Sequence, residues 1–196
     1  HIYMLQIVFA TNNYNKLKEI RHILPPTISV LGLSDIGFDT DIPENGLTLK
    51  ENATIKSSTI YERFNIDCFS DDTGLMVDDL NDAPGVYSAR YAGENASYDD
   101  NVEKLLKDLE GSTNRSAHFS TVISLFLGGI EYFFEGRIDG IISHKKSGHS
   151  GFGYDPIFIP DGYDITFSEM SSKLKNSISH RGLATSKLVK FLKDKI

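Results

Sequence analysis

The stretch Leu5-Gln6-Ile7-Val8-Phe9-Ala10-Thr11-Asn12-Asn13 decides how the chain begins to fold. Its first six residues form a short apolar run that is typical of a buried strand. Thr11-Asn12-Asn13 is prone to form a turn. Residues 14–24 then carry apolar side chains at helical spacing until Pro25-Pro26 ends the pattern. The order strand, polar loop, helix offers backbone N–H groups to an anion at the start of the helix.

The remaining chain predicts further helices and strands in alternation. Capping residues predict helices from Leu49 to about Arg63, after Ser97 and after Ser179. In the last of these helices the side chains expected to face inward are Leu183, Leu188, Val189 and Leu192. Strands are expected at 67–70, 75–77, 117–127, 130–142 and 157–159. Gly128-Gly129 predicts a hairpin, and Asp71-Asp72-Thr73-Gly74 is expected to be a turn.

These elements predict an α/β fold with a sizeable antiparallel part, because the regular βαβ repeat of a Rossmann fold or TIM barrel is missing. The length of 196 residues suits one domain, which we expect over residues 4–196. We interpret residues 1–3 as left over from expression, with a native start at Met4.

Composition excludes several classes of protein. The 20 Lys and Arg residues against 27 Asp and Glu give a net charge of −7, which argues against a nucleic-acid partner. No apolar run reaches the length of a membrane span, so no membrane partner is expected. The single cysteine, Cys68, excludes an intrachain disulfide and a cysteine-rich zinc site. It fits a reducing compartment, and we expect a cytoplasmic protein.

Acidic residues in the first half of the chain suggest a metal site. Asp71 and Asp72 are adjacent carboxylates that repel each other, and a divalent cation bound by oxygen ligands would relieve this repulsion. Glu44, just before the capped helix, is a candidate third ligand, and Lys56 on that helix is a candidate phosphate contact. The alternatives are a solvated acidic turn, a loop carboxylate and an exposed lysine.

Two segments in the second half suggest a nucleotide site. In Gly151-Phe152-Gly153-Tyr154-Asp155-Pro156, two glycines let the backbone approach a ligand while Phe152 offers a stacking face. The alternative is a tight hairpin with a packed aromatic ring. His180 and Arg181 oppose the helix macrodipole at the start of the last helix, which marks a candidate binding site, and Lys175 adds a cation. The alternative is an arginine paired with a carboxylate.

Together these features suit a substrate that combines a metal ion with a nucleotide. The sequence contains neither a Gly-x-x-x-x-Gly-Lys-Ser/Thr loop nor a Gly-x-Ser-x-Gly motif, which argues against P-loop enzymes and serine hydrolases. A different Mg²⁺-dependent phosphohydrolase and a nucleotide-binding module without catalysis stay open as alternatives.

The motifs resemble those of the inosine triphosphate pyrophosphatase family. The matching blocks occur in the family order and span nearly the whole chain: residues 9–16, 44–48, 51–53 with Lys56, 71–75, 83–91, 151–158 and 179–181. The resemblance implies hydrolysis of ITP, dITP and XTP to the monophosphate and pyrophosphate, with Mg²⁺ as cofactor and Mn²⁺ as a substitute. It also implies a homodimer, and a fold with an elongated mixed sheet flanked by helices and two lobes around a central cleft.

The resemblance also implies roles for individual residues. The residues implied to be catalytic are Asp72, Asp71 and Lys56, and those implied to hold the metal are Glu44, Asp71 and Asp72. The residues implied to bind substrate are Thr11, Asn12, Asn13, Lys16, Thr73, Phe152, Gly153, Tyr154, Asp155, Lys175, His180 and Arg181. The sequence departs from the family pattern at Thr73, where many members have serine, and at Asn12, where glycine is frequent.

Overall fold

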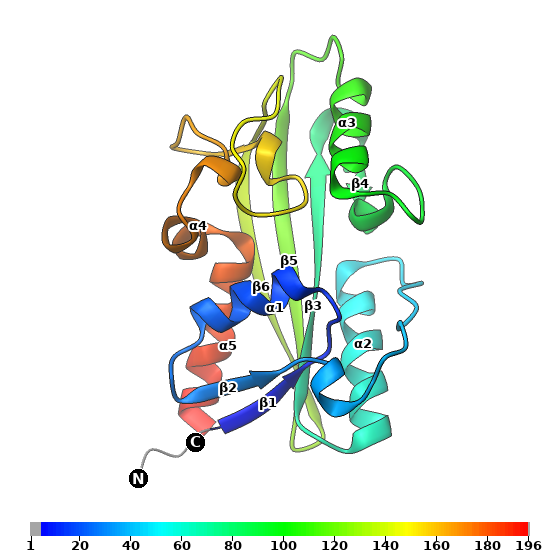
Figure 1. Ribbon diagram of the computed structural model, residues 1–196, viewed down its shortest axis with the longest axis vertical. Coiled ribbons are helices and arrows are strands. Elements are labelled where there is room, and N and C mark those ends of the chain that lie inside the picture. Colours follow the sequence, from blue (N-terminus) through cyan, green and yellow to red (C-terminus); the bar gives the residue numbers. More distant parts are fainter. Residues whose placement is uncertain (1–4, 196) are drawn as a thin grey trace. The chain divides into compact units, whose positions relative to one another are not determined.

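The computed structural model describes residues 5–195, so the expected native start at Met4 lies outside the described residues. These residues form a mixed α/β fold with five α-helices and a seven-stranded sheet (Figure 1). The helices are α1 (Tyr14–Ile23), α2 (Leu49–Phe64), α3 (Tyr98–Asp108), α4 (Ser172–Ile178) and α5 (His180–Lys195). The strands are β1 (Leu5–Phe9), β2 (Ile28–Leu31), β3 (Cys68–Val77), β4 (Pro84–Gly85), β5 (Ser116–Leu127), β6 (Ile130–Ile142) and β7 (Phe158–Pro160).

The sheet combines parallel and antiparallel strands in the order β2-β1-β3-β5-β6-β7, with β4 beside β3. Strand β1 runs parallel to β2 and β3, whereas β4 and β7 run antiparallel to β3 and β6. The predicted hairpin is confirmed, because Gly128 and Gly129 join β5 to β6 with φ angles of 59° and 82°. These left-handed angles are those that a two-residue hairpin loop requires.

The described residues form two compact units. Unit 1 comprises the chain up to Asp72, Thr121–Gly136 and the chain from Arg181 onward. Unit 2 comprises Thr73–Ser120 and Arg137–His180. The prediction of a single domain over residues 4–196 stays a prediction.

In unit 1, helices cover both faces of the sheet. The core that includes Ile20 of α1 and Leu188 of α5 packs on one face, around the stacked rings of Phe9 and Phe69. The core that includes Ile60 of α2 packs on the other face. The interior of α5 follows the predicted spacing at Leu188 and Leu192, and Val189 packs against the same core. The prediction for Leu183 was wrong, since its side chain is 40% exposed.

In unit 2, α3 packs its apolar side chains against a core that contains Phe119, Phe158 and Phe167. Ser97 caps this helix as predicted, because its side chain accepts from the backbone N–H of Asp100 while the Asp100 carboxylate accepts from the N–H of Ser97.

The helices of residues 5–195 include none long and apolar enough to cross a bilayer.

One prediction about the sheet was wrong. Asp71-Asp72-Thr73-Gly74 does not form a turn, because β3 runs unbroken through it from Cys68 to Val77. Adjacent aspartates disfavour strands when they are solvated. Here each carboxylate has a basic side chain beside it, and this compensates for the low strand propensity.

Candidate active site

Alternation along β3 directs the two aspartates to different partners. Successive side chains of a strand point to opposite faces of the sheet. Asp71 meets Lys16 of α1 and Arg181 of α5, the helices of one face, whereas Asp72 meets Lys56 of α2, the helix of the other. The backbone therefore separates two carboxylates that the sequence places side by side.

Asp71 and Arg181 form the centre of a buried ion-pair network in unit 1. Arg181 donates from Nε to Asp71 Oδ2 at 2.8 Å and from its terminal nitrogen to Glu19 Oε2 at 2.6 Å. Lys16 Nζ lies 2.9 Å from the other Asp71 oxygen. The side chains of Arg181 and Asp71 are only 2% and 1% exposed. This pairing is the alternative that the sequence had left open for Arg181.

The opposite charges of this network keep each other ionised. Burial by itself would raise the pKa of Asp71, but Lys16 and Arg181 outweigh burial and hold that pKa well below its usual range. Burial would likewise lower the pKa of Arg181, and Asp71 and Glu19 outweigh it and raise that pKa. Asp71 is therefore a permanent anion at neutral pH that anchors two cations.

Asp72 has a different environment. Lys56 Nζ lies 3.8 Å from Asp72 Oδ1, 2.5 Å from Glu44 Oε1 and 2.5 Å from the backbone oxygen of Asp71. Burial raises the pKa of Asp72 to about 6, although Lys56 and Lys16 act in the opposite direction. The second carboxylate oxygen, Oδ2, is buried and has no hydrogen-bond partner. Such an orphaned oxygen is costly unless a ligand takes it up.

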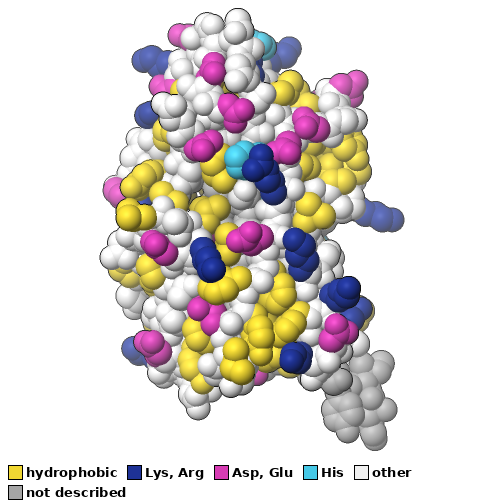
Figure 2. Space-filling model, turned by 180° about the vertical axis from the view of Figure 1, so that it is seen from behind, with side chains coloured by type: hydrophobic (Ala, Val, Ile, Leu, Met, Phe, Trp, Pro, Cys, Tyr) yellow, Lys and Arg dark blue, Asp and Glu magenta, His cyan; other side chains and the backbone are white. Residues whose placement is uncertain are grey.

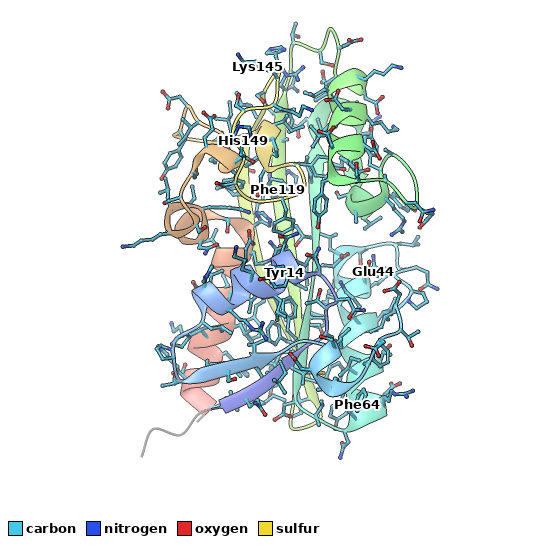
Figure 3. All side chains as sticks on the ribbon, viewed as in Figure 1. Tyr14, Glu44, Phe64, Phe119, Lys145 and His149 are labelled. Carbon is cyan, nitrogen blue, oxygen red and sulfur yellow. The ribbon has the colours of Figure 1, made fainter. Side chains whose placement is uncertain are left out.

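The loop before α2 carries Glu44 to this place. Figure 3 shows Glu44 at the end of α2 where the helix begins, and Phe64 at the opposite end. Thr48 caps α2 by accepting from the N–H of Glu51, as the sequence predicted. Asn52 Oδ1 then accepts from the N–H of Gly46 at 2.8 Å, which ties the Glu44 loop to the first turn of the helix.

The donor set of Glu44 and Asp72 fits a hard divalent cation, which prefers carboxylate oxygens. The orphaned Asp72 Oδ2 supplies one such oxygen that is already desolvated. Among residues 5–195, however, no three His, Cys, Asp or Glu side chains are grouped tightly enough to hold a metal ion. Asp71, whose two oxygens face Lys16 and Arg181, does not join Glu44 and Asp72 in such a group.

The polar loop before α1 is largely occupied by its own side chains. Asn13 caps the helix, since its Oδ1 accepts from the N–H groups of Asn15 and Lys16. Thr11 Oγ1 accepts from the N–H of Asn13 at 3.0 Å. The first turn thus offers fewer N–H groups to an anion than the sequence suggested. Asn12 is exposed and does not adopt a positive φ, so its position does not require glycine.

In unit 2, Asp155 organises the loop that carries Phe152. Asp155 Oδ2 accepts from the backbone N–H of Phe152 at 3.0 Å and from Lys175 Nζ at 2.6 Å. Lys175 Nζ lies 5.0 Å from the centre of the Phe152 ring. The centre of the Tyr98 ring lies 5.9 Å from the centre of the Phe152 ring. The structure therefore brings together three of the residues that the sequence singled out.

The other predicted residues of unit 2 have structural partners. The hydroxyl of Tyr154 is buried and donates to the backbone oxygen of Ser88 at 2.7 Å. Burial raises the pKa of this phenol above its ordinary value. His180 is buried and stacks on Phe119 at 4.5 Å. Gly153 has a φ of 61°, and Thr73 continues strand β3.

Gly151→Ala is expected to disrupt the Phe152 loop. Gly151 has a φ of 77°, and an added Cβ would lie 2.1 Å from Asp155 Oδ2. We expect a loss of about 2–4 kcal/mol in the free energy of unfolding, from backbone strain and displacement of Asp155. Urea denaturation measures this loss.

Gly162→Ala is the matched control, because Gly162 has a φ of 85° and open space around its Cβ position. It should lose only about 1 kcal/mol. Equal losses in the two variants would contradict the role assigned to Asp155.

Sequence reasoning missed Glu19. A signal was present, because Glu19 follows Lys16 by three residues and therefore lies on the same face of α1. The match between this carboxylate and Arg181, distant in the sequence, became visible only in the fold.

Comparisons with known proteins agree with the fold. The sequence model of the Ham1 family matches residues 7–191. A "dITP/XTP pyrophosphatase" of Flavobacterium johnsoniae is 50% identical over 96% of this chain and 98% of its own length. The enzyme of that name from Porphyromonas gingivalis is 50% identical over 96% of this chain and 98% of its own length.

Solved structures lead to the same result. The Ham1 protein of Staphylococcus aureus superposes with a TM-score of 0.88 at 42% identity, covering 97% of this chain and all 100% of that one. The Coxiella burnetii protein gives a TM-score of 0.88 at 37% identity over 97% of this chain and 100% of its own.

Proposed function

Since this chain belongs to the Ham1 family, we propose that it hydrolyses non-standard purine nucleoside triphosphates, ITP, dITP and XTP, to the monophosphate and pyrophosphate. The observation that carries the proposal is the charged cluster of unit 1, where Lys16 and Lys56 lie beside Asp71 and Asp72. Relatives that match nearly the whole chain and are named for this activity support it.

The proposal includes a divalent cation, Mg²⁺, which Mn²⁺ can replace at oxygen ligands. Glu44 and Asp72 are the residues that would hold it, because their carboxylates flank Lys56 and Asp72 Oδ2 has no other partner. Such a cation polarises a phosphoryl oxygen and stabilises the charge that develops during hydrolysis.

The chain's own residues would supply the remaining chemistry. Asp72, whose pKa is raised to about 6, is suited to accept a proton from the attacking water near neutral pH. Lys16 and Lys56 would offset the charge of the phosphates and of the departing pyrophosphate. Arg181 would act on the site through Asp71, which it holds at 2.8 Å, rather than by contact with the base.

Phe152 and Lys175 are the candidates for recognition of the purine. Phe152 offers a ring for stacking, and Lys175 beside it is a donor that suits an oxygen at purine C6. Adenine presents an amine donor at that position, so a buried Lys175 would lose a partner with ATP. The homodimer and the cytoplasmic location implied by the resemblance stay predictions.

The test is release of pyrophosphate from ITP, XTP, ATP and GTP, with Mg²⁺ and with EDTA. We expect metal-dependent release that favours ITP and XTP over ATP by at least about tenfold, because a mismatched donor and acceptor in a closed site costs more than 1 kcal/mol.

Two outcomes would contradict the proposal. Release of orthophosphate, or equal rates on ATP, would favour a general Mg²⁺-dependent phosphohydrolase. Nucleotide binding without any product would favour a binding module without catalysis.

A further inference from the structure

A series of hydrogen bonds between polar side chains holds one turn of α2 in the interior of unit 1. Thr54 of α2 donates from Oγ1 to Glu131 Oε2 at 2.8 Å, and Ser124 of β5 donates to the same oxygen at 2.6 Å. The hydroxyl of Ser57, also on α2, lies 2.7 Å from that of Ser124. Ser57 and Ser124 are fully buried, at 0% exposure. Within residues 5–195, none of these four residues forms a hydrogen bond or ion pair with Lys16, Asp71 or Asp72.

The direction of the hydrogen bonds follows from the number of protons. A serine hydroxyl has one proton to donate. Ser124 donates its proton to Glu131, so a hydrogen bond between the two serines uses the proton of Ser57, for which the backbone oxygen of Ala53 at 3.1 Å is a second acceptor. The series of hydrogen bonds therefore runs from Ser57 through Ser124 to Glu131, and Thr54 donates to the same carboxylate. Its two ends, Ser57 and Thr54, both belong to one turn of α2.

Strand β3 holds the same turn of α2 from a second side. Cys68 Sγ donates to the backbone oxygen of Ser57 at 3.3 Å, and Ser70 Oγ donates to the backbone oxygen of Ala53. The donors are two residues apart on a strand, about 6.6 Å, and the acceptors are four residues apart on a helix, about 6 Å. The two spacings match, so these bonds fix the position of α2 along β3 while the series of hydrogen bonds to Glu131 fixes its rotation.

Lys56 lies within the turn that is held. Neighbouring residues of a helix point about 100° apart, so a rotation of α2 that freed Ser57 or Thr54 would also turn Lys56. The ammonium of Lys56 lies 2.5 Å from both Glu44 Oε1 and the backbone oxygen of Asp71. Contacts this short leave little room for displacement of the helix.

We propose that Glu131 is a positioning residue: through Thr54, Ser124 and Ser57 it fixes the rotation of α2 and thereby aims Lys56 at Glu44 and Asp72. The proposal rests on the proposed function insofar as it concerns turnover. Both hydrogen bonds end on one oxygen, Oε2, so an amide oxygen in the same place would serve as well as a carboxylate. The position therefore needs an acceptor and not a charge.

The experiment compares Glu131→Gln with Glu131→Leu, alone and combined with Lys56→Met. Glu131→Leu should lower kcat/KM for ITP by about tenfold, since small displacements of a group at the reacting centre carry losses of this order. Glu131→Gln should stay within about twofold of the unaltered chain. In the Lys56→Met background, Glu131→Leu should cause no further loss, because a residue that acts through Lys56 has nothing left to position.

A second measurement does not depend on activity. Acylation of lysines with acetic anhydride, followed by mass spectrometry, reports how well each amine is shielded. Labelling of Lys56 should rise severalfold in Glu131→Leu and stay unchanged in Glu131→Gln. Glu135→Leu is the matched control, because Glu135 is on the same strand and its side chain is exposed. If Glu131→Leu does not fold, Thr54→Val combined with Ser124→Ala removes both hydrogen bonds to Glu131 with a smaller change in volume.

The outcomes separate the two proposals. Unchanged kcat/KM and unchanged Lys56 labelling in Glu131→Leu, or in Thr54→Val combined with Ser124→Ala, would overturn the positioning role. Losses that multiply in the double variant with Lys56→Met would also overturn it, since they would show an effect independent of Lys56. Absence of turnover in the unaltered chain would refute the proposed function instead, and Lys56 labelling would then decide the positioning role.

Discussion

Asp72→Asn is expected to abolish pyrophosphate release and, in the metal-free protein, to raise the free energy of unfolding at pH 8. The catalytic loss follows because an amide accepts no proton from water and is a weaker ligand for a divalent cation. The gain in stability follows from burial, which raises the pKa of Asp72 from 3.8 to about 6. Above pH 6 the carboxylate of Asp72 is ionised in both the folded and the unfolded state. Its ionisation costs more free energy in the folded state, because the group is buried there, and this lowers the free energy of unfolding. An uncharged amide removes this cost of roughly 3 kcal/mol at most.

The gain should depend on pH in a defined direction. At pH 4 the carboxyl is protonated in the folded state and only about half ionised in the unfolded chain, so the variant and the unaltered chain should differ little. The difference should grow between pH 4 and pH 6 and be complete above that range. Urea denaturation at pH 4, 6 and 8 with EDTA measures it.

Added Mg²⁺ provides the internal control. It should raise the melting temperature of the unaltered chain and leave that of Asp72→Asn almost unchanged, because a ligand that binds the folded state stabilises it. Normal turnover in Asp72→Asn, or an equal Mg²⁺ response in both proteins, would refute the assignment of Asp72.

Arg181→Met is expected to cause the largest loss of stability, about 3–5 kcal/mol in the free energy of unfolding. The variant keeps much of the side-chain volume but removes the contacts of Arg181 with Asp71 at 2.8 Å and with Glu19 at 2.6 Å. Asp71 keeps Lys16 at 2.9 Å, but a buried carboxylate that loses one of its cations is destabilised far more than an exposed one. Urea denaturation at pH 7 gives the loss.

Two further variants test the cause. Arg21→Met removes an arginine of α1 whose ion pair with Asp35 is long, at 3.6 Å, and about half exposed, and which also donates to the backbone oxygen of Val30 at 2.9 Å, so it should lose about 1 kcal/mol. Asp71→Asn combined with Arg181→Met should lose less than the sum of the two single losses, because the charge left behind is gone. Additive losses would indicate that packing, and not the ion pair, explains the effect.

Much of the fold was predictable because it depends on local chemistry. Thr48 and Ser97 cap helices where their side chains accept the first free N–H groups, and Gly128-Gly129 turns the hairpin. The failure at Asp71-Asp72 has the opposite cause. Its strand conformation depends on Lys16, Arg181 and Lys56, which lie far away in the sequence and which local propensity cannot take into account.

The candidate site divides in the same way. The sequence by itself determined which residue types the chain has for the chemistry: Asp72 and Glu44 as oxygen ligands, Lys16 and Lys56 as cations, and Phe152 between two glycines. It could not determine their partners. Only the tertiary structure decided that Arg181 forms ion pairs with Asp71 and Glu19, and that Lys175 forms one with Asp155. It also decided that Asp72 Oδ2 is buried without a hydrogen-bond partner. The physical reason is that strand alternation and helix packing decide which charges meet in a buried, weakly screened interior.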